Sequence, residues 1–338
     1  MSDPDPSEPE DQFDAMTESE FGAGIPETPE TAAALPGVVG IGDAADEFRN
    51  VIDIGDRYLG MATIGQGEKL AIADAVRDYV PLGIDCIAQT VNQLVADGLT
   101  PVCYTNHLSL ADPEEDLAAQ LARGLAEGAE QAGILLLGGQ LSHTPAEVAT
   151  RDVVGTAAGV ATETELFPGT AATGDRLVGF PASGLHPSTV QSAVQAVSHE
   201  YDLEDPFPGP DHSTVGAALL EPTRLFTSLL DPLREATVHA AVDLAAGGWT
   251  RLARMGEDRY SITEPLDPPP VFEFIQETSG HSLETLYETF PMGTGFVLAA
   301  PESAASAIVA ETDGRIIGAV EQGSGVRIRG MELGQADD

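Results

Sequence analysis

Short apolar runs alternate with longer amphipathic segments along this chain, and that alternation is the strongest constraint on its fold. Runs rich in Val, Ile and Leu bounded by Gly are typical of strands, whereas apolar residues three and four positions apart indicate helices. Between residues 51 and 329 the two kinds of segment alternate in both halves of the chain. The pattern predicts an α/β or α+β class.

The expected elements are these. Strands are predicted at 51–54, 58–62, 101–108, 134–137 (a buried strand), 153–160, 176–180, 295–300, 316–320 and 326–329. Helices are predicted at 84–97, 113–133, 188–198, 223–230, 270–278 and 283–290, after Trp249 and from Glu302, and a further segment is expected at 238–246.

The length of 338 residues is typical of two domains. A boundary is predicted at 168–176, where Pro, Gly and Thr gather. We therefore expect an N-terminal domain at 37–168, a C-terminal domain at 169–333 and a short tail at 334–338. Residues 1–36 are rich in acids and Pro and contain no Lys or Arg, which predicts a disordered leader.

The charge balance limits the partners of the chain. There are 55 acidic and 15 basic residues, giving a formal net charge of −40, and the acids are spread over the whole length. One interpretation is an acidic surface for a basic partner; the other is adaptation to high salt, where charge repulsion is screened. Lys69 is the only lysine, and this preference for Arg favours the high-salt interpretation. No basic groove for nucleic acid is expected.

Other features indicate a cytoplasmic chain without a membrane anchor. No apolar run reaches the roughly 18–20 residues that span a bilayer, and the start of the chain does not resemble a signal peptide. Cys86 and Cys103 lie in apolar stretches without other metal-ligand residues at suitable spacing. We expect both to be buried, reduced thiols.

Three glycine turns are candidate ligand loops. Gly65-Gln66-Gly67 precedes Lys69, an arrangement in which backbone N–H groups and one ammonium group favour phosphate. The spacing is not that of a Walker loop, and an ordinary hairpin turn with a surface lysine is the alternative. Gly138-Gly139 and Gly247-Gly248 follow predicted apolar segments, either as cleft loops or as tight connections.

Ordered motifs from about residue 51 to 333 together resemble one family, the aminoimidazole ribonucleotide synthetases (phosphoribosylformylglycinamidine cyclo-ligases). The stretches that carry the resemblance are 52–58, 83–88, 91–92, 125–133, 181–186, 220–224, 270–276 and 290–296. The details are most similar to versions from salt-loving archaea.

The resemblance implies a fold, a partner and a reaction. The fold is an N-terminal α/β domain, whose strands form a β-barrel across a homodimer, plus a C-terminal α+β domain. The reaction is the ATP- and magnesium-dependent cyclisation of formylglycinamidine ribonucleotide in purine biosynthesis. ATP is expected near Gly65, Gly67, Lys69, Asn92 and Gly138-Gly139, and the ribonucleotide phosphate near Ser183, Gly184 and His186.

The chain departs from the family pattern where the family has acids. Ile64 stands where the glycine loop of the family begins with Asp, and Gln93 replaces the acid after Asn92. Gln140 replaces the Glu after Gly138-Gly139. Magnesium takes oxygen ligands, usually carboxylates, so these replacements predict weak magnesium binding and no family-type metal site. In a chain so rich in acids, their absence here is informative.

Two hypotheses follow. The chain is an ATP-dependent cyclo-ligase, or it is a catalytically silent nucleotide-binding or regulatory module on the same scaffold; the lost acids favour a diverged paralogue. The candidate catalytic residues are Lys69, Asp85, His143 and Asp243. The acids expected to supply a rearranged site are Asp85, Glu127, Asp152 and Asp243.

Overall fold

A computed structural model describes residues 39–40, 51–110, 115–143, 152–245 and 247–334. The predicted acidic leader (1–36) and most of the tail (334–338) lie outside the described residues. The elements of the first half are β1 (Val39–Gly40), β2 (Val51–Asp53), β3 (Tyr58–Gly65), α3 (Gly67–Val76), α4 (Val80–Ala96), β4 (Thr100–Leu110), α5 (Glu115–Ala132), β5 (Leu135–His143) and β6 (Asp152–Ala161).

A linker joins them to a second set of elements. These are β7 (Arg176–Pro181), η2 (Pro187–Thr189), α6 (Val190–Val197), α7 (Val215–Leu219), η3 (Thr227–Leu229), α8 (Leu230–Glu235), β8 (Ala240–Asp243), η4 (Gly248–Met255), β9 (Arg259–Ile262), α9 (Pro270–Ser279), α10 (Leu283–Thr289), β10 (Thr294–Ala300), α11 (Glu302–Glu311), β11 (Arg315–Glu321), β12 (Val326–Ile328) and β13 (Met331–Leu333).

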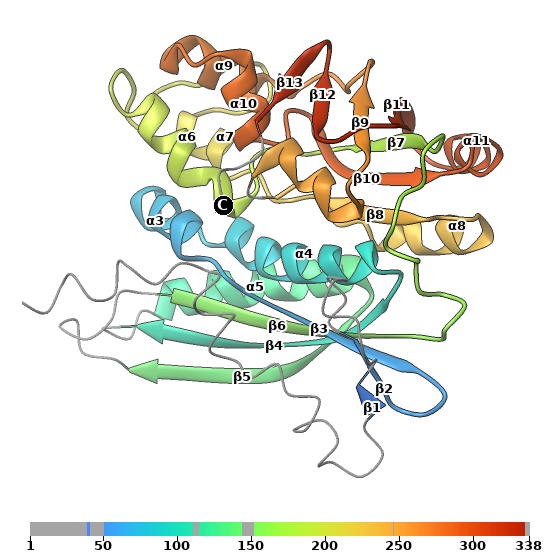
Figure 1. Cartoon of the computed structure of the whole chain (residues 1–338). Helices are drawn as coiled ribbons and strands as arrows, with labels where there is room; N and C mark the ends of the chain where they lie inside the picture. The colour runs from blue at the N-terminus through green and yellow to red at the C-terminus, as the bar shows by residue number, and fades with distance from the viewer. Residues whose placement is uncertain (1–38, 41–50, 111–114, 144–151, 246, 335–338) are drawn as a thin grey trace, which may run out of the picture.

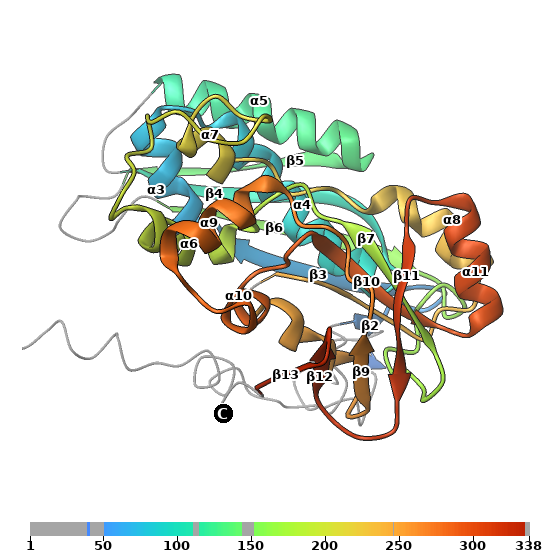
Figure 2. The ribbon, with the colours of Figure 1, turned by 90° about the horizontal axis from the view of Figure 1, so that it is seen from above.

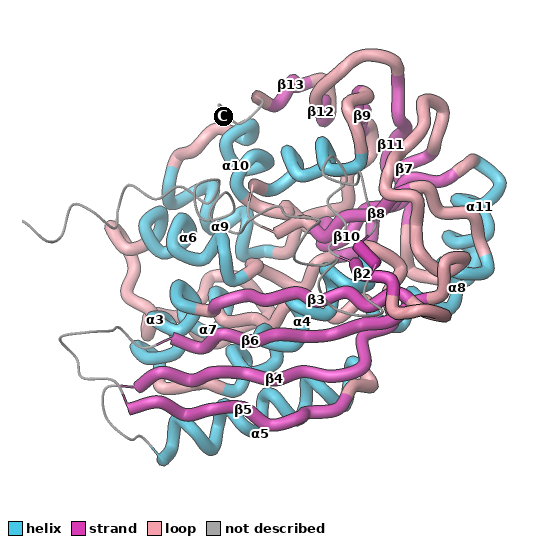
Figure 3. The backbone as a smooth tube through the Cα atoms, turned by 60° about the horizontal axis from the view of Figure 1, so that its bottom comes forward, coloured by secondary structure: helices cyan, strands magenta, loops and turns pink. Residues whose placement is uncertain are grey.

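The first sheet has strand order β1-β2-β3-β6-β4-β5. All its pairs are antiparallel except β4 with β5, which are parallel and connected through α5. Helices α4 and α5 cover one face, and Figure 3 shows no described element over the other face of β3, β6, β4 and β5. The sheet is therefore half of a sandwich in this chain, with one face available to another surface.

The second sheet has strand order β13-β12-β9-β11-β7-β10-β8 and is antiparallel except for β12 with β9. One of its inner strands, β10, is buried along its whole length. Helices α8 and α11 lie at one end, while α6, α9 and α10 lie at the other (Figure 2). The predicted alternation of helices and strands is confirmed in both halves.

Helix α4 lies between the two halves, above the first sheet and below β8 (Figure 1). It contacts β3 and β6 on one side and β8 on the other. This position explains why 13 of its residues, from Leu82 to Ala96, are buried, polar ones included. A helix buried on every side becomes part of both hydrophobic cores.

Glycines let α4 and α5 approach closely. A Cβ atom added to Gly83 would lie 2.6 Å from the carbonyl oxygen of Leu121, and one added to Gly124 would collide with the carbonyl oxygen of Val80. Because these neighbours are backbone atoms, they cannot rotate away. The glycines at this seam are therefore required by packing, although Gly is a poor helix former.

Three expectations about secondary structure are wrong. Residues 134–137 were expected to form a buried strand, but Leu135 and Leu137 of β5 are 69% and 67% exposed because β5 is the edge strand of a sheet with one uncovered face. The glycine loop at 65–67 is the junction of β3 with α3. The expected helix at 223–230 begins only at η3, since residues 223–226 belong to no helix or strand.

Smaller differences occur in the second half. The segment expected at 238–246 is the short strand β8, and the helix expected after Trp249 is the 3₁₀-helix η4, which already begins at Gly248. Cys86 is buried as expected, whereas Cys103 is only partly buried. No helix in the described part of the chain is long and apolar enough to cross a membrane.

We predict that Gly124→Ala destabilises the protein despite the higher helix propensity of Ala. The substitution gains about 1 kcal/mol of propensity, but separating the two backbones costs about 1–3 kcal/mol or more. Denaturant unfolding should therefore give a net loss of stability. The exposed Ala122→Gly on the same helix is the comparison, and it should cost about 1 kcal/mol from propensity alone. Equal or higher stability of Gly124→Ala would contradict the proposed packing.

Candidate functional site

Lys69 lies inside the protein, in the first turn of α3. The turn at Gln66 ends β3 and starts α3, and it points the Lys69 side chain at α4. The side chain is fully buried, and its Nζ lies 2.6 Å from Oδ2 of Asp85, which is also fully buried. The alternative of a surface lysine at a hairpin turn is therefore wrong.

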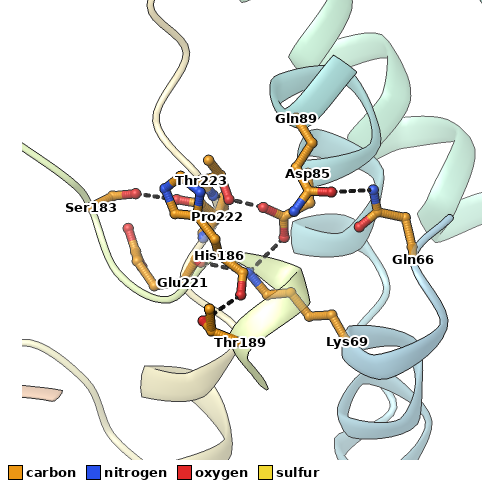
Figure 4. A network of polar contacts seen from close by, with 10 residues as sticks. All are labelled: Gln66, Lys69, Asp85, Gln89, Ser183, His186, Thr189, Glu221, Pro222 and Thr223. Carbon is orange, nitrogen blue, oxygen red and sulfur yellow. Dashed lines mark hydrogen bonds and ion pairs between the residues drawn. The ribbon is translucent and has the colours of Figure 1, made fainter. Parts of the chain in front are cut away.

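The Lys69–Asp85 pair holds a segment of the second half. Lys69 Nζ donates a hydrogen bond to the carbonyl oxygen of Glu221 at 2.7 Å. The backbone N–H of Thr223 donates to Oδ1 of Asp85 at 2.8 Å. We call residues 221–226, which belong to no helix or strand, the strap; Figure 4 shows Glu221, Pro222 and Thr223 of this segment beside Asp85 of α4.

Asn92, further along α4, also binds the strap. Its Nδ2 donates to the carbonyl oxygen of Arg224 at 2.8 Å, and its Oδ1 accepts from the N–H of Phe226 at 3.0 Å. Both ends of the amide are thus used by backbone groups. Asn92 was expected near a nucleotide, and in this structure its polar atoms are directed at the strap.

Burial raises the pKa of Asp85, and the nearby charge of Lys69 and the hydrogen bonds from Lys69 and Thr223 oppose that shift. The distance of 2.6 Å between Lys69 Nζ and Asp85 Oδ2 indicates that the two side chains form an ion pair. Removing one partner from such a pair leaves an uncompensated charge in the interior, which is strongly destabilising.

The expected substrate residues lie on the other side of the strap. Ser183 Oγ donates to the carbonyl oxygen of Pro222 at 2.5 Å. Gly184 lies against Glu221, since an added Cβ would come within 3.0 Å of that side chain. The structure therefore brings Ser183 and Gly184 to the strap, at Pro222 and Glu221, and Figure 4 shows Ser183 beside Pro222.

His186 is the expected substrate residue with an unused polar atom. It is 3% exposed, and its Nδ1 has no hydrogen-bond partner among the described residues. Burial lowers its pKa to about 4, with the nearby charges of Asp243, Lys69 and Arg251 also acting on it. The imidazole is therefore neutral at pH 7, and it offers either a lone pair or an N–H to a ligand.

A cleft of about 480 Å³ lies between the two halves. One wall comes from β3 and α4 and includes Gln93, and the opposite wall comes from β8 and η4 and includes Asp243. Its ionisable lining residues are Asp97, Asp243, Arg251, Arg254 and Glu257. The cleft therefore contains one replaced family position and one catalytic candidate.

Asp243 and Arg251 form a second ion pair at this cleft. Arg251 Nη2 donates to Oδ1 of Asp243 at 3.1 Å, and its Nε donates to the carbonyl oxygen of Asp243 at 2.9 Å. The Asp243 side chain is 6% exposed and the Arg251 side chain is 11% exposed. Two bonds to one residue fix the plane of the guanidinium group at the cleft wall.

The remaining expected residues lie elsewhere. Gly138, Gly139 and Gln140 are exposed on β5, away from the lining of the cleft. Gly65 ends β3 near the carboxylate of Asp152, as an added Cβ would lie 3.6 Å from it. His143 ends β5, where it pairs in register with Leu110 of β4, also away from the cleft.

Two positions where the resemblance leads us to expect acids, Ile64 and Gln93, carry no carboxylate. Among the described residues, no three His, Cys, Asp or Glu side chains gather closely enough to hold a metal. Ile64 is a half-buried hydrocarbon, and Gln93 offers one neutral oxygen. Hard divalent cations prefer carboxylate oxygens, so the replaced positions supply poor ligands.

Sequence reasoning missed several residues of this network. Gln66 Nε2 donates to Oε1 of Gln89 at 3.2 Å in the interior beside Lys69. Glu221 and Thr223 take part through backbone atoms, which leave no signal in a sequence. Arg251 could have been noticed as a basic residue shortly after Gly247-Gly248 in an acid-rich chain.

Comparisons with known proteins identify relatives for both halves. The family described as AIR synthase related protein, N-terminal domain, matches residues 46–161, and its C-terminal domain matches residues 172–330. The phosphoribosylformylglycinamidine cyclo-ligase of Methanococcoides burtonii is 33% identical over 290 residues, which cover 85% of this chain and 86% of that protein.

Solved structures show the same fold at lower identity. The crystal structure of tt0281 from Thermus thermophilus is 23% identical with a TM-score of 0.63, covering 96% of this chain and 100% of that one. AaThiL complexed with AMPPCP and TMP is 17% identical with a TM-score of 0.61, covering 94% of each chain.

We predict that Lys69→Met costs about 3–5 kcal/mol of unfolding free energy, because it leaves Asp85 charged and unpaired in the interior. The double substitution Lys69→Met with Asp85→Asn removes both charges, so it should recover a large part of that loss. Denaturant unfolding of the two variants measures the difference. If the double variant is no more stable than Lys69→Met, the ion pair is not what holds the strap.

Proposed function

We propose, because this chain belongs to the AIR synthase related protein family, that it binds a ribonucleotide and ATP between its two halves and has weakened metal-dependent catalysis. Its relatives are named as the cyclo-ligase of purine biosynthesis. On this proposal the chain is a diverged cytoplasmic paralogue with slow turnover. The composition supports adaptation to high salt.

The observation that carries the proposal is the chemistry of the interdomain cleft. Phosphoryl transfer depends on neutralising charge on the transferring group, usually through magnesium held by carboxylates. Here Gln93 lines the cleft, and Asp243 is already paired with Arg251. Each lost electrostatic donor typically costs about 10²–10³-fold in rate. The missing carboxylates therefore lower the rate of phosphoryl transfer more than they lower the affinity for the ligand.

The chain keeps groups that can bind and orient a ligand. His186 is neutral, buried and without a described partner at Nδ1, so it can form one directed hydrogen bond. Arg251 presents a fixed guanidinium group at the cleft wall. The strap and α4 exclude water from the Lys69–Asp85 pair, since Lys69, Asp85 and Thr223 are all buried.

A binding or regulatory module is the second candidate function. It is favoured by the use of Lys69 and Asn92 in holding the strap, because both were expected to contact nucleotide. The extent of the similarity, 85% of the chain to a named cyclo-ligase, favours the enzyme. A silent module would hold ATP equally well with and without magnesium and release no ADP.

We predict slow turnover that a restored carboxylate increases. With ATP, magnesium and formylglycinamidine ribonucleotide, ADP release should stay below about 0.1 s⁻¹, against about 10 s⁻¹ for a typical enzyme. The double variant Ile64→Asp with Gln93→Asp should raise the rate at least about tenfold. Ala126→Asp, an acid added on the exposed face of α5, is the control and should change nothing.

The assay should be run in both about 0.1 M and about 2 M KCl, since screening should favour so acidic a chain. A rate near that of an ordinary enzyme in the unchanged chain would refute weakened catalysis. Absence of any ATP or ribonucleotide binding in either salt would refute the proposed function altogether.

We also propose that the chain forms a homodimer through the uncovered face and edge of the first sheet. Large apolar side chains are exposed there: Met61 (55%), Leu135 (69%), Leu136 (42%), Leu137 (67%) and Leu141 (59%). Exposed apolar patches of this kind mark protein interfaces. A second copy would extend or close the half-covered sheet, as expected from the family.

We predict that Leu135→Glu with Leu137→Glu yields a monomer, because burying two carboxylates in an apolar interface is unfavourable. Light scattering coupled to size exclusion measures the mass. Ile316→Glu is the matched control, since Ile316 is 38% exposed on β11 of the other half. A native chain that is monomeric at micromolar concentration would refute the dimer.

A further inference from the structure

We infer that Arg234 is a positioning residue for the interdomain cleft. Together with the strap, it fixes the second half against the first half on both sides of the cleft, so that a ligand enters without movement of the halves. That this cleft is the ligand site rests on the proposed function, whereas the attachments themselves do not depend on it.

Arg234 belongs to α8, which lies beside the end of α4 (Figure 1), and it ties three parts of the chain together. Its Nη2 donates to the carbonyl oxygen of Gly98 at 3.0 Å and to the hydroxyl oxygen of Thr100 at 2.7 Å, where α4 turns into β4. Its Nη1 lies 3.4 Å from Oε1 of Glu165 in the linker. One guanidinium group of the second half therefore holds the first half and the linker at the same place.

The two attachments bracket the cleft along α4. On one side, Asn92 is bonded to the strap. On the other side, Gly98 lies just beyond the end of α4 and is bonded to Arg234. The residues of α4 and its C-terminal turn that line the cleft between these two points are Gln93, Leu94, Ala96 and Asp97. This wall of the cleft is therefore fixed to the second half at both of its ends.

The linker has no free length at this junction in which a hinge could bend. The backbone N–H of Phe167 donates to the carbonyl oxygen of Asp97 in the first half at 3.2 Å. The N–H of Gly169 donates to the carbonyl oxygen of His239 in the second half at 2.7 Å. Only Pro168 lies between these two bonds, and its ring fixes φ. A hinge needs residues that can change φ and ψ, so this junction is stiff.

Gly98 lets the linker pack directly on the turn after α4. Its φ is +83°, and an added Cβ would collide with the carbonyl oxygen of Glu165 and lie 3.1 Å from the nitrogen of Phe167. Turn and linker therefore meet backbone against backbone. The Arg234 side chain covers this contact and is only 20% exposed, which limits competition from water for its hydrogen bonds.

A cleft of fixed width changes what ligand binding requires. Because neither half has to move, association should not be slowed by a conformational step, and little conformational entropy is lost. The same stiffness prevents the halves from closing over the ligand to exclude water, a movement that many enzymes use before phosphoryl transfer. Slow turnover with retained binding, as in the proposed function, fits such a cleft.

The distance between the halves can be measured by electron spin resonance with one label on each half. Ala126→Cys on α5 and Ala307→Cys on α11 are exposed label sites, used with Cys103→Ser and with labelled chains diluted into unlabelled ones. We expect one narrow distance distribution that saturating ATP does not change. In Arg234→Met the distribution should become at least about twofold broader, because one of the two attachments is lost.

Arg176→Met is the matched control, because it removes an arginine and its ion pair with Glu302 inside the second half. It should leave the distance distribution unchanged. Arg234→Lys keeps the charge and can donate to Gly98 or Thr100, so it should restore part of the narrow distribution. If Arg234 only stabilised the fold, its replacement would lower the unfolding free energy without broadening the distribution.

Thr100→Val is a milder variant for use if Arg234→Met does not fold, because it removes one acceptor of Arg234 and keeps the charge. Hydrogen exchange of the Phe167 amide, which is bonded to Asp97 across the junction, reports on local opening. Its rate relative to the amides of β10 should rise at least about threefold in this variant.

The outcomes separate this inference from the proposed function. A broad distribution in the unchanged chain, a shift on addition of ATP, or equal widths with and without Arg234 overturns the positioning role. So does a relative exchange rate of Phe167 that Thr100→Val leaves unaltered. A width that depends on Arg234, in a chain that binds neither ATP nor ribonucleotide, supports the positioning role and refutes the proposed function alone.

Discussion

The ion pair between Lys69 and Asp85 is the interaction on which the arrangement of the two halves depends. Two opposite charges without solvent contact, 2.6 Å apart, are tolerated only if their other bonding positions are filled. The backbone of the strap fills them, at Glu221 and Thr223. A segment of the second half thus supplies the hydrogen bonds that the buried ion pair of the first half needs. The two halves share this ion pair and also the apolar contacts around α4.

That arrangement explains where a ligand can bind. The side of α4 nearest the strap is occupied by the ion pair, Asn92 and the strap itself, so it is closed. Further along α4, Gln93 opens on the cleft between the halves. The neutral His186 lies between these two regions, within the influence of both Lys69 and Arg251. On the proposed function, the strap side of α4 is structural and the cleft side is the one that faces the ligand.

Much of the fold could be read from the sequence, because periodicity reports directly which face of an element is apolar. The helices at α4 and α5 and most strands follow from it. The burial of Leu135–Leu137 was predicted wrongly, because an apolar run has the same sequence pattern whether its own chain or another surface covers it. The turn at 65–67 misled because Gly is typical of both open loops and helix starts.

The site was less predictable, for a physical reason. Ser183 was expected near a ligand from its motif alone, and the structure places it at the strap. The role of Lys69 depends on Asp85, Glu221 and Thr223, which are brought together only by the fold. Two of those three residues take part through backbone atoms, which any residue type provides. Ile64, Gln93 and Gln140, by contrast, can be read directly in the sequence, at positions where the resemblance leads us to expect acids.

Asn92 sets a limit on how far a chain of this kind can be acidified. Asn and Asp have nearly the same shape, and a single nucleotide change or spontaneous deamidation converts one into the other. At position 92 the change would turn the donor facing the carbonyl oxygen of Arg224 into a second acceptor, and would bury a charge. Enrichment in acids, which reaches a net charge of −40 over the molecule, therefore has to stop at this amide.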